Sequence, residues 1–336
     1  MNGSTAKSGP AVSSFGSPGS DAPLDPSLFT DVADTLGIAH PAIVEKDYYA
    51  VQLLKLLSTL ETPNYTLVFA GGTCLAKAHQ DTYRMSEDID IKLIPSEETL
   101  QKSRTAQRQL RRVLHRQIVD LFENSDLFGL IQEPIKRNEY KFQQFMFEYP
   151  THHGRFDALR PHLQLDLVES TLLQAPLNSP ICSLYTEVVK DDHEVSEFLC
   201  AALESTAAEK FVSLLRRTAA FARDHDKKDE PMLIRHLYDL HLILTGGAKI
   251  ELIKEIVPQV IAIDAADFGN QHPEFRDDPV SELIFGFEKL IQEPQYKQRY
   301  AEFIGPLVYH PDPADWDAAI TSFKNFIHSI LNDRCA

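Results

Sequence analysis

The sequence predicts an α+β fold in which strands and helices alternate over the first half of the chain and helices fill the second half. Two observations support this prediction. Short apolar runs, several of them alternating with polar residues, indicate strands, and they lie before residue 170. Apolar residues at a spacing of three to four, which is typical of helices, dominate from residue 196 onward. With 336 residues, the chain is long enough for two domains.

Composition limits the classes of protein that the sequence can encode. Apolar residues at 43% and charged residues at 24% are close to globular averages. No apolar run reaches the roughly 18 residues of a membrane span, and the first twenty residues lack a signal-peptide pattern, so we expect a cytoplasmic protein without membrane contact. The four cysteines form no C-x-x-C pair and predict reduced thiols. A net charge of -16 argues against a protein that coats nucleic acid through its overall charge.

The first ordered elements follow from local patterns. Residues 40–60 carry apolar side chains at helical spacing. Residues 65–72, YTLVFAGG, are an apolar, β-branched and aromatic run that glycines end, which predicts a buried strand and a turn. A short helix is expected over 73–80. The alternation in SEDIDIKL, residues 86–93, predicts a second strand.

A helix is expected over 100–123, with its charge on one side. At about 100° per residue, the apolar side chains occupy one face and five arginines the other. This basic face could be a strip for the phosphate backbone of RNA, or a solvated face that offsets nearby acid. The arginines are Arg104, Arg108, Arg111, Arg112 and Arg116.

The later elements repeat the same two patterns. Alternation over 141–150 and 162–170 predicts two more strands. A long helix is expected over 196–224 with Ser196 as its N-cap, and another over 232–244, closed by a glycine pair. Helical patterns with Pro-rich breaks continue to the end of the chain.

Three regions are therefore expected. Residues 1–25 are rich in Gly, Ser and Pro and predict a flexible tail. Residues 26–190 would form the α+β core. Residues 191–336 would form a helical region that contributes side chains to a shared site.

Two carboxylates on the second strand suggest a metal site. Side chains at i and i+2 of a strand point to the same face, so Asp88 and Asp90 project together. Their repulsion is relieved by a divalent cation such as Mg²⁺ or Mn²⁺, which takes oxygen ligands. An exposed polar face of an edge strand is the ordinary alternative.

Further residues supply the rest of a phosphate-transfer site. The Gly-Gly-Thr turn at 71–73 opens a helix whose free N–H groups can receive an anion. Asp166 adds a carboxylate on another strand. Lys210 and Arg217 share one side of a helix, although either could be an ordinary surface cation. Together these are the parts that metal-assisted phosphoryl or nucleotidyl transfer requires.

The segment FAGGTCLAKAHQDTYRMSEDIDIKL (69–93) resembles the signature of the AbiEii/AbiGii-type nucleotidyltransferases, which include the MenT toxins. That signature runs G-G-T/S and then Arg-x-Ser-x-Asp-Ile-Asp. Four further segments resemble the family in the same order, at 44–57, 163–169, 208–217 and 235–244, so the resemblance covers roughly residues 40–245. The signature positions are Gly71, Gly72, Thr73, Arg84, Ser86, Asp88, Ile89 and Asp90.

The resemblance implies a fold and a set of roles. It implies a polymerase-β-like nucleotidyltransferase core, with a mixed sheet flanked by helices, and a helical C-terminal region. Asp88, Asp90 and Asp166 would hold Mg²⁺, and the glycine turn would cradle the triphosphate. Lys210 would neutralise phosphate charge. The other roles stay open, since Asp239 could orient Lys210 or contact substrate, and Arg84 and Ser86 could contact phosphate or brace the turn.

The resemblance also implies a biological role. Such proteins act as toxins of bacterial toxin-antitoxin pairs and transfer a nucleotide from a nucleoside triphosphate to an acceptor. RNA, in particular the 3′ end of tRNA, is the acceptor we expect, and a cognate antitoxin the expected partner. A nucleotide-binding regulatory or scaffold protein of the same fold, without transferase activity, is the alternative.

Overall fold

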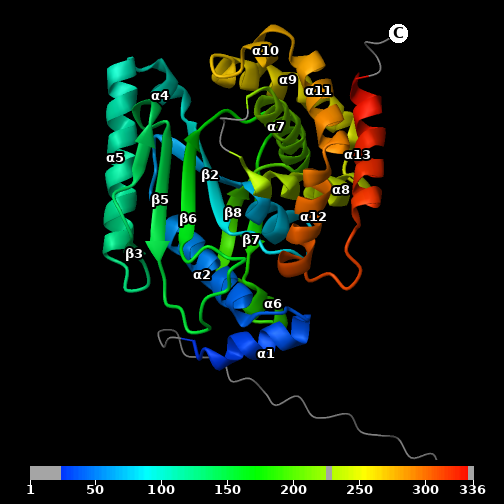
Figure 1. Ribbon diagram of the computed structural model, residues 1–336. Helices are drawn as coiled ribbons and strands as arrows, with labels where there is room; N and C mark the ends of the chain where they lie inside the picture. The colour runs from blue at the N-terminus through cyan, green and yellow to red at the C-terminus, as the bar shows by residue number, and fades with distance from the viewer. Residues whose placement is uncertain (1–23, 225–228, 332–336) are drawn as a thin grey trace, which may run out of the picture.

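An eight-stranded mixed β-sheet forms the centre of the computed structural model, which describes residues 24–224 and 229–331 (Figure 1). The strand order is β3-β5-β6-β2-β1-β8-β7, and β4 pairs with β5 at one edge. The strands are β1 (Tyr65–Ala70), β2 (Asp88–Pro95), β3 (Gly129–Leu130), β4 (Ile135–Arg137), β5 (Phe142–Glu148), β6 (Leu163–Glu169), β7 (Leu177–Ile181) and β8 (Val195–Cys200).

The central strands combine antiparallel and parallel pairing. Strand β2 runs antiparallel to β1 and parallel to β6, and β1 runs parallel to β8. The register places Asp90 of β2 opposite Ala70 of β1 on one side and opposite Asp166 of β6 on the other. The predicted mixed sheet is therefore confirmed, and its middle brings two of the predicted carboxylates onto neighbouring strands.

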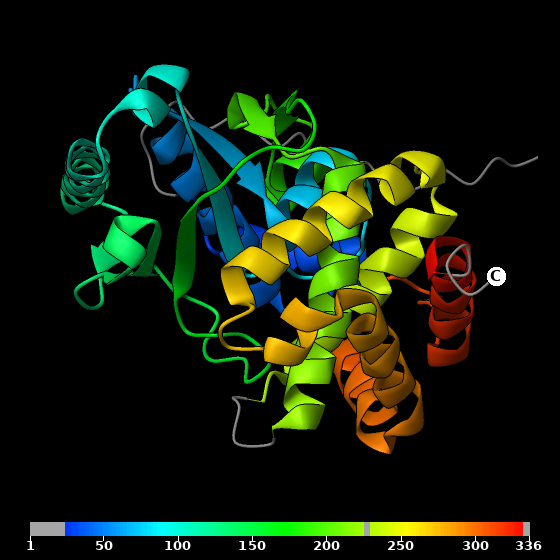
Figure 2. The same cartoon turned by 90° about the horizontal axis from the view of Figure 1, so that it is seen from above.

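Helices cover the sheet in two groups, which Figures 1 and 2 show on opposite sides of it. Helices α2 and α5 pack on one face, through a buried cluster that includes Ile89, Ile91 and Ile118. The C-terminal helices α7 to α13 form a second layer, and Lys92 of β2 pairs with Glu209 of α7 across the interface. The helices are α1 (Ser27–Leu36), α2 (Pro41–Ser58), α3 (Gly71–Cys74), α4 (Glu97–Gln101), α5 (Arg104–Glu123), α6 (Leu184–Val189), α7 (Leu203–Arg223), α8 (Arg235–Thr245), α9 (Ile250–Phe268), α10 (Pro273–Asp277), α11 (Pro279–Gln292), α12 (Pro294–Leu307) and α13 (Trp316–Leu331).

One predicted helix is wrong at its start. Residues 195–200 form strand β8 rather than the first turns of a helix, and α7 begins at Leu203 after Ala202, so Ser196 is no N-cap. The pairing of β8 with β1 explains the difference, because the N–H of Ala201 donates to the carbonyl of Phe69 at 2.8 Å. The sheet thus includes a strand from beyond residue 190.

The C-terminal helices also reach the loop that precedes β2. The N–H of Met85 donates to the carbonyl of Leu307, and the N–H of Tyr309 donates to the carbonyl of Tyr83, each at 2.8 Å. These two hydrogen bonds form an antiparallel bridge between Arg84 and Val308. The loop between the glycine turn and β2 is therefore held by a segment that lies more than 200 residues later in the chain.

Two expectations fall partly outside the described residues. Of the predicted flexible tail, only residues 24 and 25 belong to the described residues. Cys335 also lies outside the described residues. The other three cysteines are free thiols, as predicted: Cys74, Cys182 and Cys200. Among the helices that the structure describes, none has the length and apolar character needed to cross a membrane.

Candidate active site

The three predicted metal ligands lie on one face of two adjacent strands. In β2, Ile89 and Ile91 are almost fully buried in the core, so the alternation turns Asp88 and Asp90 to the opposite face. The parallel register with β6 sets Asp166 directly beside Asp90. The structure thus brings the three residues together on one face of the sheet.

Nitrogen donors occupy several of the carboxylate oxygens. Arg160 Nη2 donates to Asp88 Oδ1 at 2.5 Å. The amides of Gln144 and Gln164 donate to Asp166 Oδ1 at 3.0 Å and Oδ2 at 2.9 Å. In residues 24–224 and 229–331, no set of three or more His, Cys, Asp or Glu side chains is arranged, as it stands, to hold a metal ion. Asp88 Oδ1 and both oxygens of Asp166 are engaged by donors of the protein itself.

The electrostatics of the cluster nevertheless fit a divalent cation. Burial, followed by the neighbouring charges of Asp88 and Asp166, raises the pKa of Asp90 to about 7. Burial is also the main cause of the raised pKa of Asp166, and Asp88 adds to it. The raised pKa values of both carboxyl groups indicate negative charge that the surrounding groups do not fully balance. Carboxylate oxygens in such a cluster are the ligands that Mg²⁺ and Mn²⁺ prefer.

The glycine turn packs directly against the carboxylates. Gly71 follows β1 with φ of +75°, a conformation that glycine adopts without strain. A Cβ at this position would lie 2.0 Å from Asp90 Oδ2. The hydroxyl of Thr73 donates to the backbone carbonyl of Asp88 at 2.5 Å. The turn and the acidic strand are therefore one packed unit, and residue 71 has no room for a side chain.

Arg84 and Ser86 lie at the second glycine of the turn. A Cβ on Gly72 would lie 2.6 Å from Arg84 Nη2 and 2.9 Å from Ser86 Oγ. The absence of a side chain at Gly72 thus lets a guanidinium and a hydroxyl approach the backbone closely. Both groups are placed where they could either contact a phosphate or brace the turn.

We expect Gly71→Ala to reduce transferase activity at least about tenfold, because the methyl group displaces the carboxylate of Asp90 and the positive φ strains an alanine. Gly154→Ala is the matched control. Gly154 also has a positive φ, +69°, but its Cβ would meet nothing within 4 Å. Gly154→Ala should lose about 1 kcal/mol of stability in urea denaturation from the strained φ alone, and Gly71→Ala should lose more because of the added steric conflict with Asp90. Equal activities for the two variants would contradict the role of Gly71.

A buried ion network joins the C-terminal helices to the turn. Asp239 of α8 is fully buried and accepts hydrogen bonds from Arg84 Nε at 2.6 Å and Arg84 Nη2 at 2.7 Å. Lys210 Nζ of α7 lies 2.9 Å from Asp239 Oδ2. Although burial opposes ionisation, the two cations hold the pKa of Asp239 far below its usual range. This geometry favours the orienting role for Asp239 over substrate contact.

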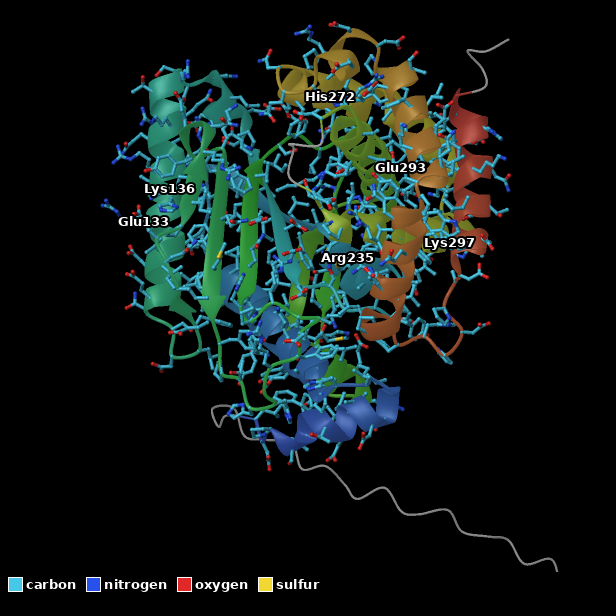
Figure 3. All side chains as sticks on the ribbon, viewed as in Figure 1. Glu133, Lys136, Arg235, His272, Glu293 and Lys297 are labelled. Carbon is cyan, nitrogen blue, oxygen red and sulfur yellow. The ribbon has the colours of Figure 1, made fainter. Side chains whose placement is uncertain are left out.

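Arg235 lies beside the acidic cluster, whereas Arg217 pairs within the C-terminal region. Arg217 pairs with Glu230, and burial lowers its pKa to about 10. Arg235 Nη2 lies 3.9 Å from Asp88 Oδ2, and Figure 3 shows Arg235 between the sheet and the C-terminal helices. The neighbouring His236 has a buried Nδ1 without a hydrogen-bond partner among the described residues. Burial and nearby cations lower the pKa of His236 strongly, so its ring is neutral.

Among the residues of this region that were not predicted from the sequence, three form one connected network. They are Lys46 of α2, Glu87, which precedes Asp88, and Arg160 of the loop before β6. Hydrogen bonds connect each of the three to the other two. For Lys46 a signal was present, because Glu45, Lys46 and Asp47 interrupt an apolar helix and buried charges need partners. For Arg160, an isolated arginine in a loop, the sequence offered no signal.

The basic face expected on the helix at 100–123 is only partly correct. Arg111 is buried, and its guanidinium pairs with Glu169, with Nη1 2.8 Å from Glu169 Oε2. Arg108, Arg112 and Arg116 are exposed. Because α5 packs on the apolar face of β2, these arginines lie behind the sheet, away from the carboxylates. They do not line the mouth of the candidate site.

Comparisons with known proteins show what the chain is similar to. The model of one protein family, described as nucleotidyl transferase AbiEii toxin of a type IV toxin-antitoxin system, matches residues 55–322. Among solved structures, the fold is similar to that of MenT4, a nucleotidyltransferase toxin from Mycobacterium tuberculosis H37Rv. The TM-score is 0.55 at 17% identity, with 93% of this chain and 90% of that chain covered. No curated protein sequence matches the chain.

Proposed function

This chain belongs to the AbiEii family of nucleotidyltransferase toxins and is a nucleotidyltransferase, and from that premise we propose a specific chemistry for it. The enzyme transfers a nucleoside monophosphate from a nucleoside triphosphate to an acceptor hydroxyl in a reaction that requires Mg²⁺ or Mn²⁺. The observation that carries the proposal is the register of β2 and β6, which sets Asp88, Asp90 and Asp166 on one face beside the glycine turn.

Each part of the site has a role in this chemistry. Asp88 and Asp90 would hold the cation, and Asp166 would lie on the acceptor side. Bound there, the cation would neutralise charge on the phosphates and favour ionisation of the attacking hydroxyl. The backbone N–H groups of the turn at 71–73, with Arg84 and Ser86, receive the triphosphate. Lys210, held by Asp239, places a fixed positive charge toward the departing pyrophosphate.

We expect the acceptor to be RNA, with the 3′ end of tRNA as the leading candidate, and a cognate antitoxin to inhibit the enzyme. Both expectations come from the family. The exposed arginines of α5 lie behind the sheet. We therefore expect the acceptor end to approach over β5 and β6, on the face where Val168 is 42% exposed next to Asp166.

The test is transfer of label from each of the four α-labelled nucleoside triphosphates to total RNA or to total cell protein. We expect labelled RNA with one or two of the triphosphates, and complete loss of labelling in EDTA. Label in protein but not in RNA would contradict the RNA acceptor. Triphosphate binding without transfer to either acceptor would instead support a regulatory or scaffold protein of the same fold.

A further inference from the structure

Arg160 makes contacts through both its backbone and its side chain. Its N–H donates to Glu87 Oε2 at 2.7 Å, and its carbonyl accepts from Lys46 Nζ at 2.7 Å. Its Nη1 donates to Gln164 Oε1 at 2.8 Å, and its Nη2 donates to Asp88 Oδ1 at 2.5 Å. Residue 160 is thus fixed at the backbone and engaged at the guanidinium.

The backbone of Arg160 is held more firmly than its side chain. Lys46 and Glu87 form a buried ion pair of 2.6 Å, with their side chains 0% and 6% exposed. Breaking such a pair is costly, so it anchors the backbone of Arg160. The side chain of Arg160 is 35% exposed. The guanidinium can therefore turn into solvent while the backbone stays in place.

The position of the guanidinium conflicts with a divalent cation on Asp88. The guanidinium of arginine is a permanent positive charge in proteins. A cation that used Asp88 Oδ1 as a ligand would meet the like charge of Arg160 Nη2, which now lies 2.5 Å from that oxygen. Binding of the cation at this oxygen therefore favours departure of the guanidinium, because the two positive charges repel each other at this distance. Once displaced, it is an unpaired cation at the edge of the site.

We propose that Arg160 is a counter-ion of Asp88 that a divalent cation displaces, and that the freed guanidinium then binds the phosphates of the nucleotide. The inference rests on the proposed function, because it needs Asp88 as a metal ligand. A guanidinium suits the second task, since its planar set of N–H donors matches phosphate oxygens. Arg160 would thereby couple the arrival of the metal to the binding of the triphosphate.

The test compares metal and phosphate binding in two arginine variants of the full chain. Arg160→Gln removes the charge and keeps the two backbone hydrogen bonds. Arg155→Gln is the matched control, because Arg155 lies in the same loop with its side chain 82% exposed and pairs with Asp157 rather than with Asp88. The probes are Mn²⁺ alone, followed by its spin resonance signal, and inorganic tripolyphosphate in excess Mg²⁺, followed by calorimetry. Tripolyphosphate avoids the question of which base the enzyme prefers.

We expect Arg160→Gln to bind Mn²⁺ alone about tenfold more tightly than the unmodified protein, and tripolyphosphate about tenfold more weakly. The variant lacks the hydrogen bond from Arg160 to Asp88 in the metal-free protein and the hydrogen bond from Arg160 to phosphate in the complex. Loss of one such charge-assisted hydrogen bond corresponds to about a tenfold change in affinity. Arg155→Gln should change neither affinity. Unchanged or weaker Mn²⁺ binding in Arg160→Gln would overturn the counter-ion role, and unchanged tripolyphosphate binding would overturn the phosphate role.

A third variant separates this inference from the proposed function. Asp88→Asn should abolish tight Mn²⁺ binding if the carboxylates form the metal site. If Asp88→Asn binds Mn²⁺ as the unmodified protein does, the proposed metal site itself fails. If Asp88→Asn loses Mn²⁺ and Arg160→Gln behaves like the control, only the role of Arg160 fails.

Discussion

Replacing Asp90 with asparagine is expected to lower nucleotide transfer at least about 1,000-fold and, at the same time, to make the protein more stable. Activity falls because the central carboxylate of the proposed metal site loses its charge. Stability rises because the charge of Asp90 is opposed by burial and by the charges of Asp88 and Asp166. An asparagine removes these penalties at nearly the same volume.

The gain in stability should depend on pH in a defined direction. The pKa of Asp90 is about 7 in the folded protein against 3.8 normally. Between these values the folded state binds a proton that the unfolded state has released, so this group makes stability fall as the pH rises from about 4 to about 7. Asp90→Asn removes the effect. Its advantage in melting temperature, measured in EDTA, should therefore be several degrees at pH 8 and less than half as large at pH 5.

Asp157→Asn serves as the control for this measurement. The side chain of Asp157 is 94% exposed, and it pairs with Arg155 rather than with a residue of β2. We expect this variant to follow the unmodified protein at both values of pH and to retain transfer. An Asp90→Asn variant with the same stability advantage at pH 5 and pH 8, or with none, would contradict the assignment of an unfavourable charge at Asp90.

The second large effect is expected at Asp239. Asp239→Ala leaves the guanidinium of Arg84 and the ammonium of Lys210 buried without their shared partner. Loss of one partner from a buried ion pair typically costs about 3–5 kcal/mol, and we expect a loss of this size in urea denaturation. Transfer should also be lost, because Lys210 and the turn-contacting Arg84 are then no longer held in position.

A matched surface pair tests whether burial is the cause. Asp157 pairs with Arg155 at 3.4 Å, and both side chains are more than 80% exposed. Exposed pairs contribute about 0–1 kcal/mol, so Asp157→Ala should change stability by less than about 1 kcal/mol. A similarly small loss for Asp239→Ala would show that the network does not link the C-terminal helices to the turn as described.

The parts of the site that were predictable from sequence depend on short-range geometry. The alternation around Ile89 fixes the common direction of Asp88 and Asp90 whatever the rest of the fold does. The glycine pair and the alternating strand at 162–170 were equally local signals. Their convergence on one site depends on the register of β2 and β6, two strands that lie far apart in the sequence, and no local pattern specifies that register.

The incorrect predictions concern residues whose role is set by distant partners. Strand β8 is extended because β1 pairs with it, and its short apolar pattern is ambiguous between strand and helix. Arg111 was grouped with the exposed arginines by its charge. Its position at helical spacing with Leu114, Ile118 and Phe122 places it on the buried stripe of α5. The partner that makes this burial tolerable, Glu169, lies 58 residues away.

The antiparallel bridge at Val308 limits how far the chain can be shortened. A fragment that ends before Leu307 would keep every acidic residue of the site and both glycines. It would nevertheless lose the two hydrogen bonds that hold Tyr83 and Met85, on either side of the arginine that pairs with Asp239. The segment that carries the signature residues is therefore not sufficient for an active enzyme by itself. Its loop is held in position by hydrogen bonds to the C-terminal part of the chain.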